Sequence, residues 1–214
     1  MSTHNKIVNI YKSRQNILNI LDSIYGYDIT DYSGFSYNEV DAMYNNDQLD
    51  MLLTHKKSGD KTIPMSKTYI KYNLQGSLNS SSLNVIIEDL YALSDTLSKE
   101  DCLFIVYDGE PNDSLVKYLN QIYANDNIFV VVYNIKRLQF NILEHALVPK
   151  VSIMSEKEVE ALKTKYSIDN MKKLPEISRF DPQAQAICLR PGQVCCFIRN
   201  SVTSMETPYY RVCV

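Results

Sequence analysis

Two uninterrupted apolar segments constrain the fold of this chain more than any other feature of its sequence. They span residues 102–107 and 128–133, and apolar residues with helical spacing precede each, over 85–97 and 114–123. A strand that is apolar on both faces must be covered on both faces, which is typical of a parallel sheet flanked by helices. We therefore expect the N-terminal half to be a small α/β domain.

The first helix of this domain is expected over residues 4–24, where apolar residues repeat along one stripe. Gly26 follows at the position that favours a left-handed cap. Arg14 falls within the apolar half of the helix, so its guanidinium should either reach solvent or meet a carboxylate.

Shorter elements are expected between this helix and the apolar strands. Ser36 and Glu39 have the spacing of a capping box and predict a second helix that reaches about Leu49. Residues 51–55 and 68–74 predict strands, and a Ser- and Asn-rich loop should follow over 76–82.

An acidic loop follows the first apolar strand, at the sheet edge where α/β domains usually bind ligands. Its acids are Asp108, Glu110 and Asp113. One hypothesis is a Mg²⁺ site in a stand-alone nuclease. The other is a loop that caps the next helix, with Asp113 as the N-cap. The sequence favours the second, since it has neither an acid-x-lysine motif on a predicted strand nor a glycine-rich phosphate loop.

Charge and cysteine content exclude several classes of protein. The net charge is −3, which argues against a transcription factor that binds DNA tightly by itself.

Charge is distributed unevenly along the chain. Residues 1–143 carry 12 Lys and Arg against 17 Asp and Glu, whereas residues 144–214 carry 10 against 8. We therefore expect a domain boundary after residue 143.

The five cysteines include no C-x-x-C pair, so we expect reduced thiols, no metal and no cofactor. No apolar run reaches the ~18 residues of a membrane span, and no signal segment opens the chain. The expectation is a soluble intracellular protein. Basic residues that could contact phosphates, or simply lie in solvent, are Lys56, Lys57, Lys61, Lys136 and Arg137.

The sequence of the C-terminal half predicts a small α+β domain with a mixed sheet. Asp181 is a good N-cap and Pro182 fits the first helical position, so a short helix should cover 183–188. The sheet should combine strands 145–152, 194–199 and 209–214. Further expected features are a strand over 138–143, a capping box at Ser155 and Glu158, a tight turn at Pro191–Gly192, and a loop over 200–208 within the terminal hairpin.

The order of residues in this half resembles one family of RNA polymerase subunits, the fifth-largest common subunit of eukaryotic nuclear polymerases and its archaeal counterpart. The matching residues are Leu174, Pro175, Ile177, Asp181, Pro182, Ala184, Leu189, Gly192, Gln193, Val194, Ile198, Arg199, Ser201, Thr203, Tyr210 and Arg211. The segment from Glu144 to Pro149 also resembles the family's domain junction. Asn200 and Val202 depart from the pattern, which usually has a proline and an acid there.

The resemblance implies a non-catalytic subunit without a cofactor, a metal or catalytic residues. Residues 1–143 would form a jaw domain similar in fold to restriction endonucleases but without their active site. It would lie beside the downstream duplex DNA, with a loop of Gly109, Pro111, Asn112 and Ser114 facing that DNA. Residues 144–214 would form the assembly domain.

That domain would dock on the largest polymerase subunit and touch a neighbouring small subunit. The residues expected to bind the largest subunit are Asp181, Pro182, Arg190, Gly192, Gln193, Arg199, Ser201, Thr203 and Arg211. A cellular member would be nuclear, and a viral one would occupy the virion or a cytoplasmic viral factory. The abundance of Asn, Ile and Tyr suits an A+T-rich genome, such as that of a giant virus or a protist.

Overall fold

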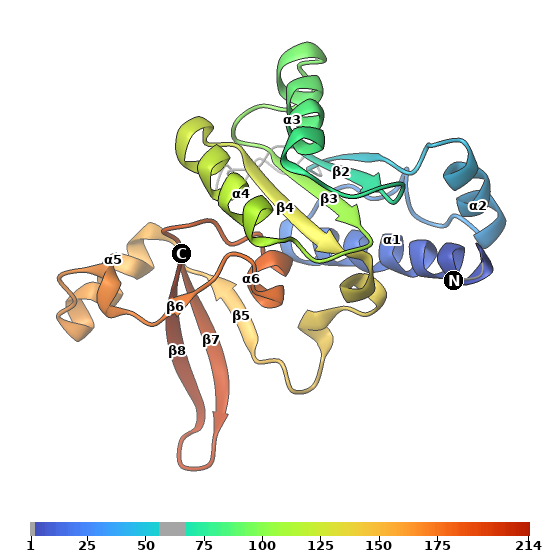
Figure 1. Cartoon of the computed structure of the whole chain (residues 1–214). Helices are drawn as coiled ribbons and strands as arrows, with labels where there is room; N and C mark the ends of the chain where they lie inside the picture. Colours follow the sequence, from blue (N-terminus) through green and yellow to red (C-terminus); the bar gives the residue numbers. More distant parts are fainter. Residues whose placement is uncertain (1–2, 56–66) are drawn as a thin grey trace. The chain divides into compact units, whose positions relative to one another are not determined.

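The chain folds into two compact units, which the computed structural model divides between Phe140 and Asn141. The structure describes residues 3–55 and 67–214 (Figure 1). Each unit has its own sheet, with strand order β1-β2-β3-β4 in the first and β5-β7-β8-β6 in the second.

The N-terminal unit alternates helices with strands. Its elements are α1 (Thr3–Tyr25), α2 (Tyr37–Asn45), β1 (Met51–Thr54), β2 (Lys67–Asn73), α3 (Ser80–Glu88), the π-helical turn η1 (Asp89–Leu93), β3 (Cys102–Tyr107), α4 (Asp113–Asp126), β4 (Phe129–Asn134) and the 3-10 turn η2 (Ile135–Gln139). Strand β1 runs antiparallel to β2, and β2, β3 and β4 run parallel to one another. The two apolar segments are therefore neighbouring parallel strands, as predicted.

The core of this unit lies on both faces of β3 and β4, every residue of which is buried. Figure 1 shows α3 and α4 on one face of the sheet and α1 on the other. Right-handed crossovers between consecutive parallel strands place α3 and α4 on the same face. Helix α1 covers the remaining face with Ile10, Ile17 and Leu21, which are almost wholly buried.

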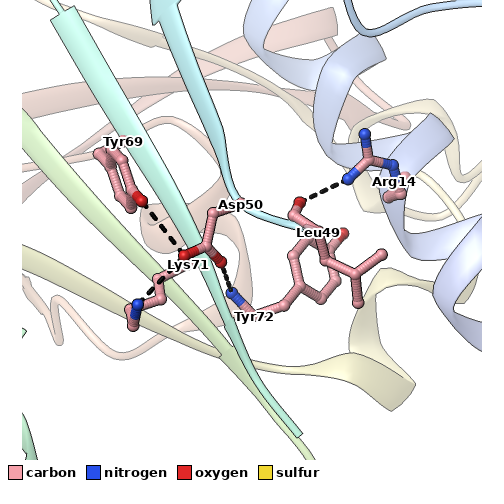
Figure 2. A network of polar contacts seen from close by, with 6 residues as sticks. All are labelled: Arg14, Leu49, Asp50, Tyr69, Lys71 and Tyr72. Carbon is pink, nitrogen blue, oxygen red and sulfur yellow. Dashed lines mark hydrogen bonds and ion pairs between the residues drawn. The ribbon is translucent and has the colours of Figure 1, made fainter. Parts of the chain in front are cut away.

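A polar network ties β1 to β2 and reaches towards α1 (Figure 2). The carboxylate of Asp50 accepts hydrogen bonds from the Tyr69 hydroxyl at 3.1 Å and the Tyr72 backbone N–H at 2.9 Å, and it forms an ion pair with Lys71 at 3.1 Å. The residue before Asp50 connects the network to α1, because a guanidinium nitrogen of Arg14 donates to the carbonyl oxygen of Leu49. Arg14 thus meets a backbone carbonyl, which neither sequence hypothesis anticipated.

Helix ends in this unit follow the capping residues closely, but two predicted boundaries are wrong. The capping box of Ser36 and Glu39 is present, yet α2 ends at Asn45 because the chain reverses through Asp47, with φ of 53°. Helix α3 begins at Ser80, inside the predicted loop.

The strand predicted over residues 138–143 is also wrong. The segment forms two 3-10 turns, η2 and η3 (Ile142–Glu144). The side chains of Asn134 and Asn141 accept hydrogen bonds from the backbone N–H groups two residues later, at 2.9 and 3.1 Å. Such bonds favour a turn over an extended strand.

The C-terminal unit is α+β with a mixed sheet, as expected. The strand predicted over 145–152 is wrong in its first part and begins only at Lys150, because the Val148 N–H donates to the carbonyl oxygen of His145 at 2.9 Å and closes a turn there. After η3 it contains β5 (Lys150–Ile153), α5 (Glu156–Tyr166), the 3-10 turn η4 (Met171–Lys173), β6 (Glu176–Ile177), α6 (Pro182–Ala186), β7 (Val194–Ser201) and β8 (Met205–Cys213). Strands β5, β7 and β8 pair antiparallel, and β6 pairs with β8 in parallel.

The β7–β8 hairpin is longer than predicted. Its strands pair as far as Ser201 opposite Met205, so the turn contains three residues in place of the nine-residue loop expected over 200–208. The Ser201 hydroxyl closes the turn by accepting from the N–H groups of Thr203 and Ser204, both at 3.4 Å. Most of the predicted loop is therefore strand.

Candidate functional site

A groove of about 610 Å³ opens on the C-terminal unit. Its walls come from residues 146–150, from the start of α6, and from β7 and β8. Apolar residues such as Phe197 and Ile177 form part of the lining, and Lys150, Arg199 and Arg211 bring positive charge to it.

Two hydrogen-bond donors in the lining of the groove are unsatisfied. The Nε atom of Arg211 and the Nε2 atom of Gln183 are buried, and neither has a hydrogen-bond partner within the described part of the chain. A buried donor without an acceptor costs about 1–3 kcal/mol. Both residues line the groove, so an acceptor placed there would recover this cost.

Stacking against one tyrosine orients the arginines on the hairpin. The guanidinium of Arg199 lies 3.9 Å from the ring centroid of Tyr209, and that of Arg211 lies 5.4 Å from it. Neither arginine forms an ion pair with a described residue. The cation–π contacts hold both cations in place without neutralising them. Their charges therefore remain available to a partner.

The start of α6 forms as predicted. The side chain of Asp181 accepts from the Gln183 N–H at 2.9 Å, and Pro182 occupies the first turn. The helix ends at Ala186, two residues earlier than predicted, and Cys188 then takes a left-handed conformation with φ of 45°. Asp181 lines the groove, while its carboxylate also serves as the cap.

The predicted residues of the Arg190–Gln193 turn lie elsewhere. The side chain of Gln193 accepts from the Arg190 N–H at 2.9 Å, and the Gly192 N–H donates to the carbonyl of Cys213 at 2.9 Å. Gly192 has a φ of 87°, which favours glycine. These residues join the turn to the last strand and do not line the groove.

The other two predicted binding residues lie at the hairpin tip. The hydroxyl oxygens of Ser201 and Thr203 are 3.2 Å apart. The groove thus contains Asp181, Arg199 and Arg211 from the predicted set, and sequence reasoning missed Gln183. The sequence signal that could have identified Gln183 is its position directly after Pro182, because that position places its side chain in the first turn of α6.

The acidic loop of the N-terminal unit is neutralised by the turn that follows β4. Asp108 pairs with Lys136 at 3.5 Å, and Glu110 pairs with Arg137 at 3.0 Å. A second Arg137 nitrogen, Nε, also donates to Glu110, at 3.2 Å. The cap of α4 is Asn112, whose side chain accepts from the Leu115 N–H at 2.8 Å.

Asp113 is therefore the first helical residue, and its prediction as the N-cap is wrong. Of the predicted phosphate contacts, Lys136 and Arg137 form the ion pairs above, while Lys56, Lys57 and Lys61 lie outside the described residues. Residues 3–55 and 67–214 bring together no group of three or more His, Cys, Asp or Glu side chains that could hold a metal ion. Among them there is also no helix long and apolar enough to cross a membrane.

The cysteines are free thiols, and most are buried. Burial raises the pKa of Cys195 to about 11 and that of Cys213 to about 12. At neutral pH both thiols are protonated and poorly nucleophilic. They fill the core beside the groove, which agrees with the prediction of reduced, buried cysteines.

Comparison with known proteins matches the C-terminal third of the chain. A family model described as RNA polymerase Rpb5, C-terminal domain, matches residues 140–213. The proteins called DNA-directed RNA polymerase subunit Rpo5 from Pyrococcus horikoshii and Methanococcoides burtonii are 42% and 37% identical to the chain over 76 and 73 residues. These matches cover 36% and 34% of the chain and 92% of each relative. The Archaeoglobus fulgidus protein of that name is 35% identical over 77 residues, which is its whole length and 36% of the chain.

Proposed function

From the premise that the chain belongs to the Rpb5/Rpo5 family of DNA-directed RNA polymerase subunits, we propose that its C-terminal unit docks on the largest polymerase subunit through the groove. The chain is a structural, non-catalytic subunit of a multisubunit polymerase. The observation that carries the proposal is the match to residues 140–213, the segment that contains the groove.

The chemistry of the groove supports a protein partner. Its two unsatisfied donors, Arg211 Nε and Gln183 Nε2, call for acceptors such as backbone carbonyls or carboxylates. Phe197 and Ile177 are almost wholly buried, so the apolar area open to a partner comes mainly from Leu147, which is 87% exposed. Interfaces of stable complexes combine such an apolar centre with a few well-placed arginines. The remaining predicted residues, at the Arg190–Gln193 turn and the hairpin tip, would contact the largest subunit outside the groove, and a neighbouring small subunit would complete the interface.

The N-terminal unit, in this proposal, is the jaw domain that frames the downstream DNA. We propose as well that this unit has a fold similar to that of restriction endonucleases but without their active site. The loop of Gly109, Pro111, Asn112 and Ser114 would face the duplex. The ion pairs of Asp108 with Lys136 and of Glu110 with Arg137 support this, because they reduce the repulsion that unpaired acids would exert on phosphates. A polymerase subunit works inside the cell. We propose that the protein is nuclear if a cell encodes it, and that it occupies the virion or a cytoplasmic viral factory if a virus encodes it.

Co-purification tests the assignment. The chain, tagged at its N-terminus and isolated gently from its native host, should bring down the two large polymerase subunits. Arg211→Glu should abolish this association, because it places a carboxylate where the groove needs a donor. Lys172→Glu is the matched control, since it makes the same charge change at an exposed position outside the groove. Retention of Arg211→Glu at the wild-type level would contradict the groove as the docking surface.

A second arm separates the two units. A chain that lacks residues 1–143 should still associate with the polymerase, whereas deletion of residues 209–214 should release it. Loss of association in the first variant, with residues 144–214 still folded by circular dichroism, would contradict the assignment of assembly to the C-terminal unit. The family assignment does not favour the Mg²⁺ nuclease or the independent transcription factor.

A further inference from the structure

The buried face of α1 holds a positive charge without a counter-ion. Arg14 is only 4% exposed. One of its terminal nitrogens donates to the carbonyl oxygen of Leu49. No carboxylate of a described residue lies within ion-pair distance of it. An arginine is almost never fully buried unless it is paired, so this position calls for an explanation.

The nearest acid is already engaged with other groups. Figure 2 shows the Asp50 carboxylate turned towards Tyr69, Lys71 and Tyr72, whereas Arg14 meets the neighbouring residue, Leu49, through its carbonyl. Asp50 has a full charge partner in Lys71 at 3.1 Å. It therefore offsets the charge of Arg14 only from a distance, and the guanidinium keeps unused N–H donors.

A cavity of about 260 Å³ lies beside this guanidinium. Arg14 lines it together with Tyr32 and Asn19. The Tyr32 oxygen accepts from the Leu52 N–H at 3.2 Å, so its own hydroxyl hydrogen can still donate. Leu18 and Phe35 supply apolar walls, and the Arg14 guanidinium carbon lies 5.9 Å from the centroid of the Phe35 ring.

These groups select an anion with an apolar stem. Burial lowers the pKa of Arg14, and the charges of Tyr72, Tyr32 and Asp50 raise it. A guanidinium nevertheless stays protonated in proteins. A carboxylate can accept two parallel N–H donors from it, while a short aliphatic stem contacts the apolar walls. Phosphate is more strongly hydrated and carries more charge, which the acidic N-terminal half disfavours.

We propose that this cavity binds the carboxylate of a glutamate or aspartate side chain in an extended segment of a partner protein. The acid supplies the counter-ion that Arg14 lacks within the chain, and an apolar neighbour in the segment packs on Leu18 and Phe35. The proposal does not depend on the groove of the C-terminal unit. It adds to the N-terminal unit a protein-binding site separate from the loop proposed to face DNA.

Nuclear magnetic resonance of the full chain tests the site directly. The Nε–H resonance of Arg14, in protein labelled with ¹⁵N-arginine, reports contact with an anion. Titration with acetyl-Leu-Glu-amide should shift this resonance in a saturable way. Acetyl-Leu-Gln-amide, which has the same shape without the charge, should bind at least about tenfold more weakly, since hydrogen bonds between charged groups contribute about 1.5–3 kcal/mol.

Variants separate the cavity from general charge effects. Arg14→Gln should abolish binding of acetyl-Leu-Glu-amide, followed through the backbone resonances of Gly34 and Phe35. Lys12→Gln removes the same charge from an exposed position on the same helix and should leave binding unchanged. Tyr32→Phe keeps the ring and removes the hydroxyl, so it should weaken binding severalfold even if Arg14→Gln does not fold.

Three results would each overturn the proposal. The first is equal binding of the two dipeptides to the wild-type chain. The second is the absence of a saturable shift at dipeptide concentrations up to about 50 mM, well above the millimolar range expected of so small a ligand. The third is tighter binding of inorganic phosphate than of acetyl-Leu-Glu-amide, which would identify the cavity as a phosphate site.

Discussion

The two units differ in how completely they bury their own sheet. In the N-terminal unit every residue of β3 and β4 is buried, because helices cover both faces. In the C-terminal unit β7 and β8 are buried only near the ends that pair Val194 with Val212, and their other ends are exposed. Val202 at the hairpin tip is fully exposed and Met205 is 84% exposed.

This difference has a physical consequence for function. A sheet covered on both faces buries its apolar surface within the unit, so β3 and β4 leave no apolar face for a partner to cover. A short sheet with exposed apolar residues and unsatisfied donors leaves free energy to be gained on binding. The two units also differ in how they hold charge. Arg14 is almost wholly buried beside a cavity of about 260 Å³, whereas Arg199 and Arg211 line the larger groove of about 610 Å³.

The largest expected effect separates the two units by unfolding one of them. Ile105→Asp places a carboxylate in the fully buried centre of β3 and should cost at least about 5 kcal/mol, enough to unfold the N-terminal unit. Alkylation followed by mass spectrometry should then show Cys102 reacting rapidly while Cys195 and Cys213 stay protected. Leu93→Asp is the control, because Leu93 is 80% exposed and should tolerate the change. Simultaneous exposure of all three thiols would mean that the units do not unfold independently.

The thiols of the folded C-terminal unit provide the second test. Because burial raises the pKa of Cys213 to about 12, its thiolate fraction at pH 8 should be about 1,000-fold below that of an ordinary cysteine. Its alkylation should therefore be slower by at least that factor. Cys196 is half-buried on the opposite face of β7 from Cys195 and should react first. Rapid labelling of Cys213 in native protein would show that the end of β8 opens readily.

Alkaline pH should destabilise the N-terminal unit through Tyr72. Burial raises the pKa of this tyrosine to about 12, and its oxygen lies 3.2 Å from the hydroxyl oxygen of Ser13. The folded state thus prefers the protonated phenol. The stabilisation is complete below the unfolded pKa of about 10 and is lost as the pH rises from about 10 to about 12.

The expected loss is about 1–2 kcal/mol, discounted because the residue is only partly buried. Urea unfolding at several pH values measures it. In Tyr72→Phe this slope should become shallower without vanishing, since Tyr107, whose pKa burial also raises to about 12, still titrates. Tyr209→Phe, in the C-terminal unit, should leave the slope unchanged. An equal slope in wild type and Tyr72→Phe would assign the alkaline loss to other groups.

The smallest effects should be alike in the two units. Ser36 and Ser155 form equivalent capping boxes with Glu39 and Glu158. Each serine hydroxyl accepts from the N–H of its glutamate, at 3.5 and 3.4 Å, so Ser→Ala at either position should cost about 1 kcal/mol. Denaturant titration of the two variants measures both. A much larger loss at Ser155 would show that α5 matters more to its unit than local capping implies.

Local signals in the sequence identified most elements of both units. The capping boxes at Ser36 and Ser155, the Asp181–Pro182 helix start and the Pro191–Gly192 turn all depend on residues within a few positions of one another. The same locality explains the errors. Asn112 and Asp113 are both good caps, so spacing alone does not choose between them. Over residues 138–143, the turn-forming bonds of Asn134 and Asn141 outweigh an apolar pattern that resembles a strand.

The order of residues from Leu174 onward determined the family by itself, because turn, cap and strand residues at fixed spacing form a specific pattern. The two apolar strands likewise determined the parallel sheet. Only the tertiary structure decided which charges are paired. Glu110 and Arg137 are distant in sequence yet form an ion pair, whereas Arg14 and Arg211 are left without one among the described residues. Pairing depends on distances between side chains from different elements, and no local pattern in a sequence contains those distances.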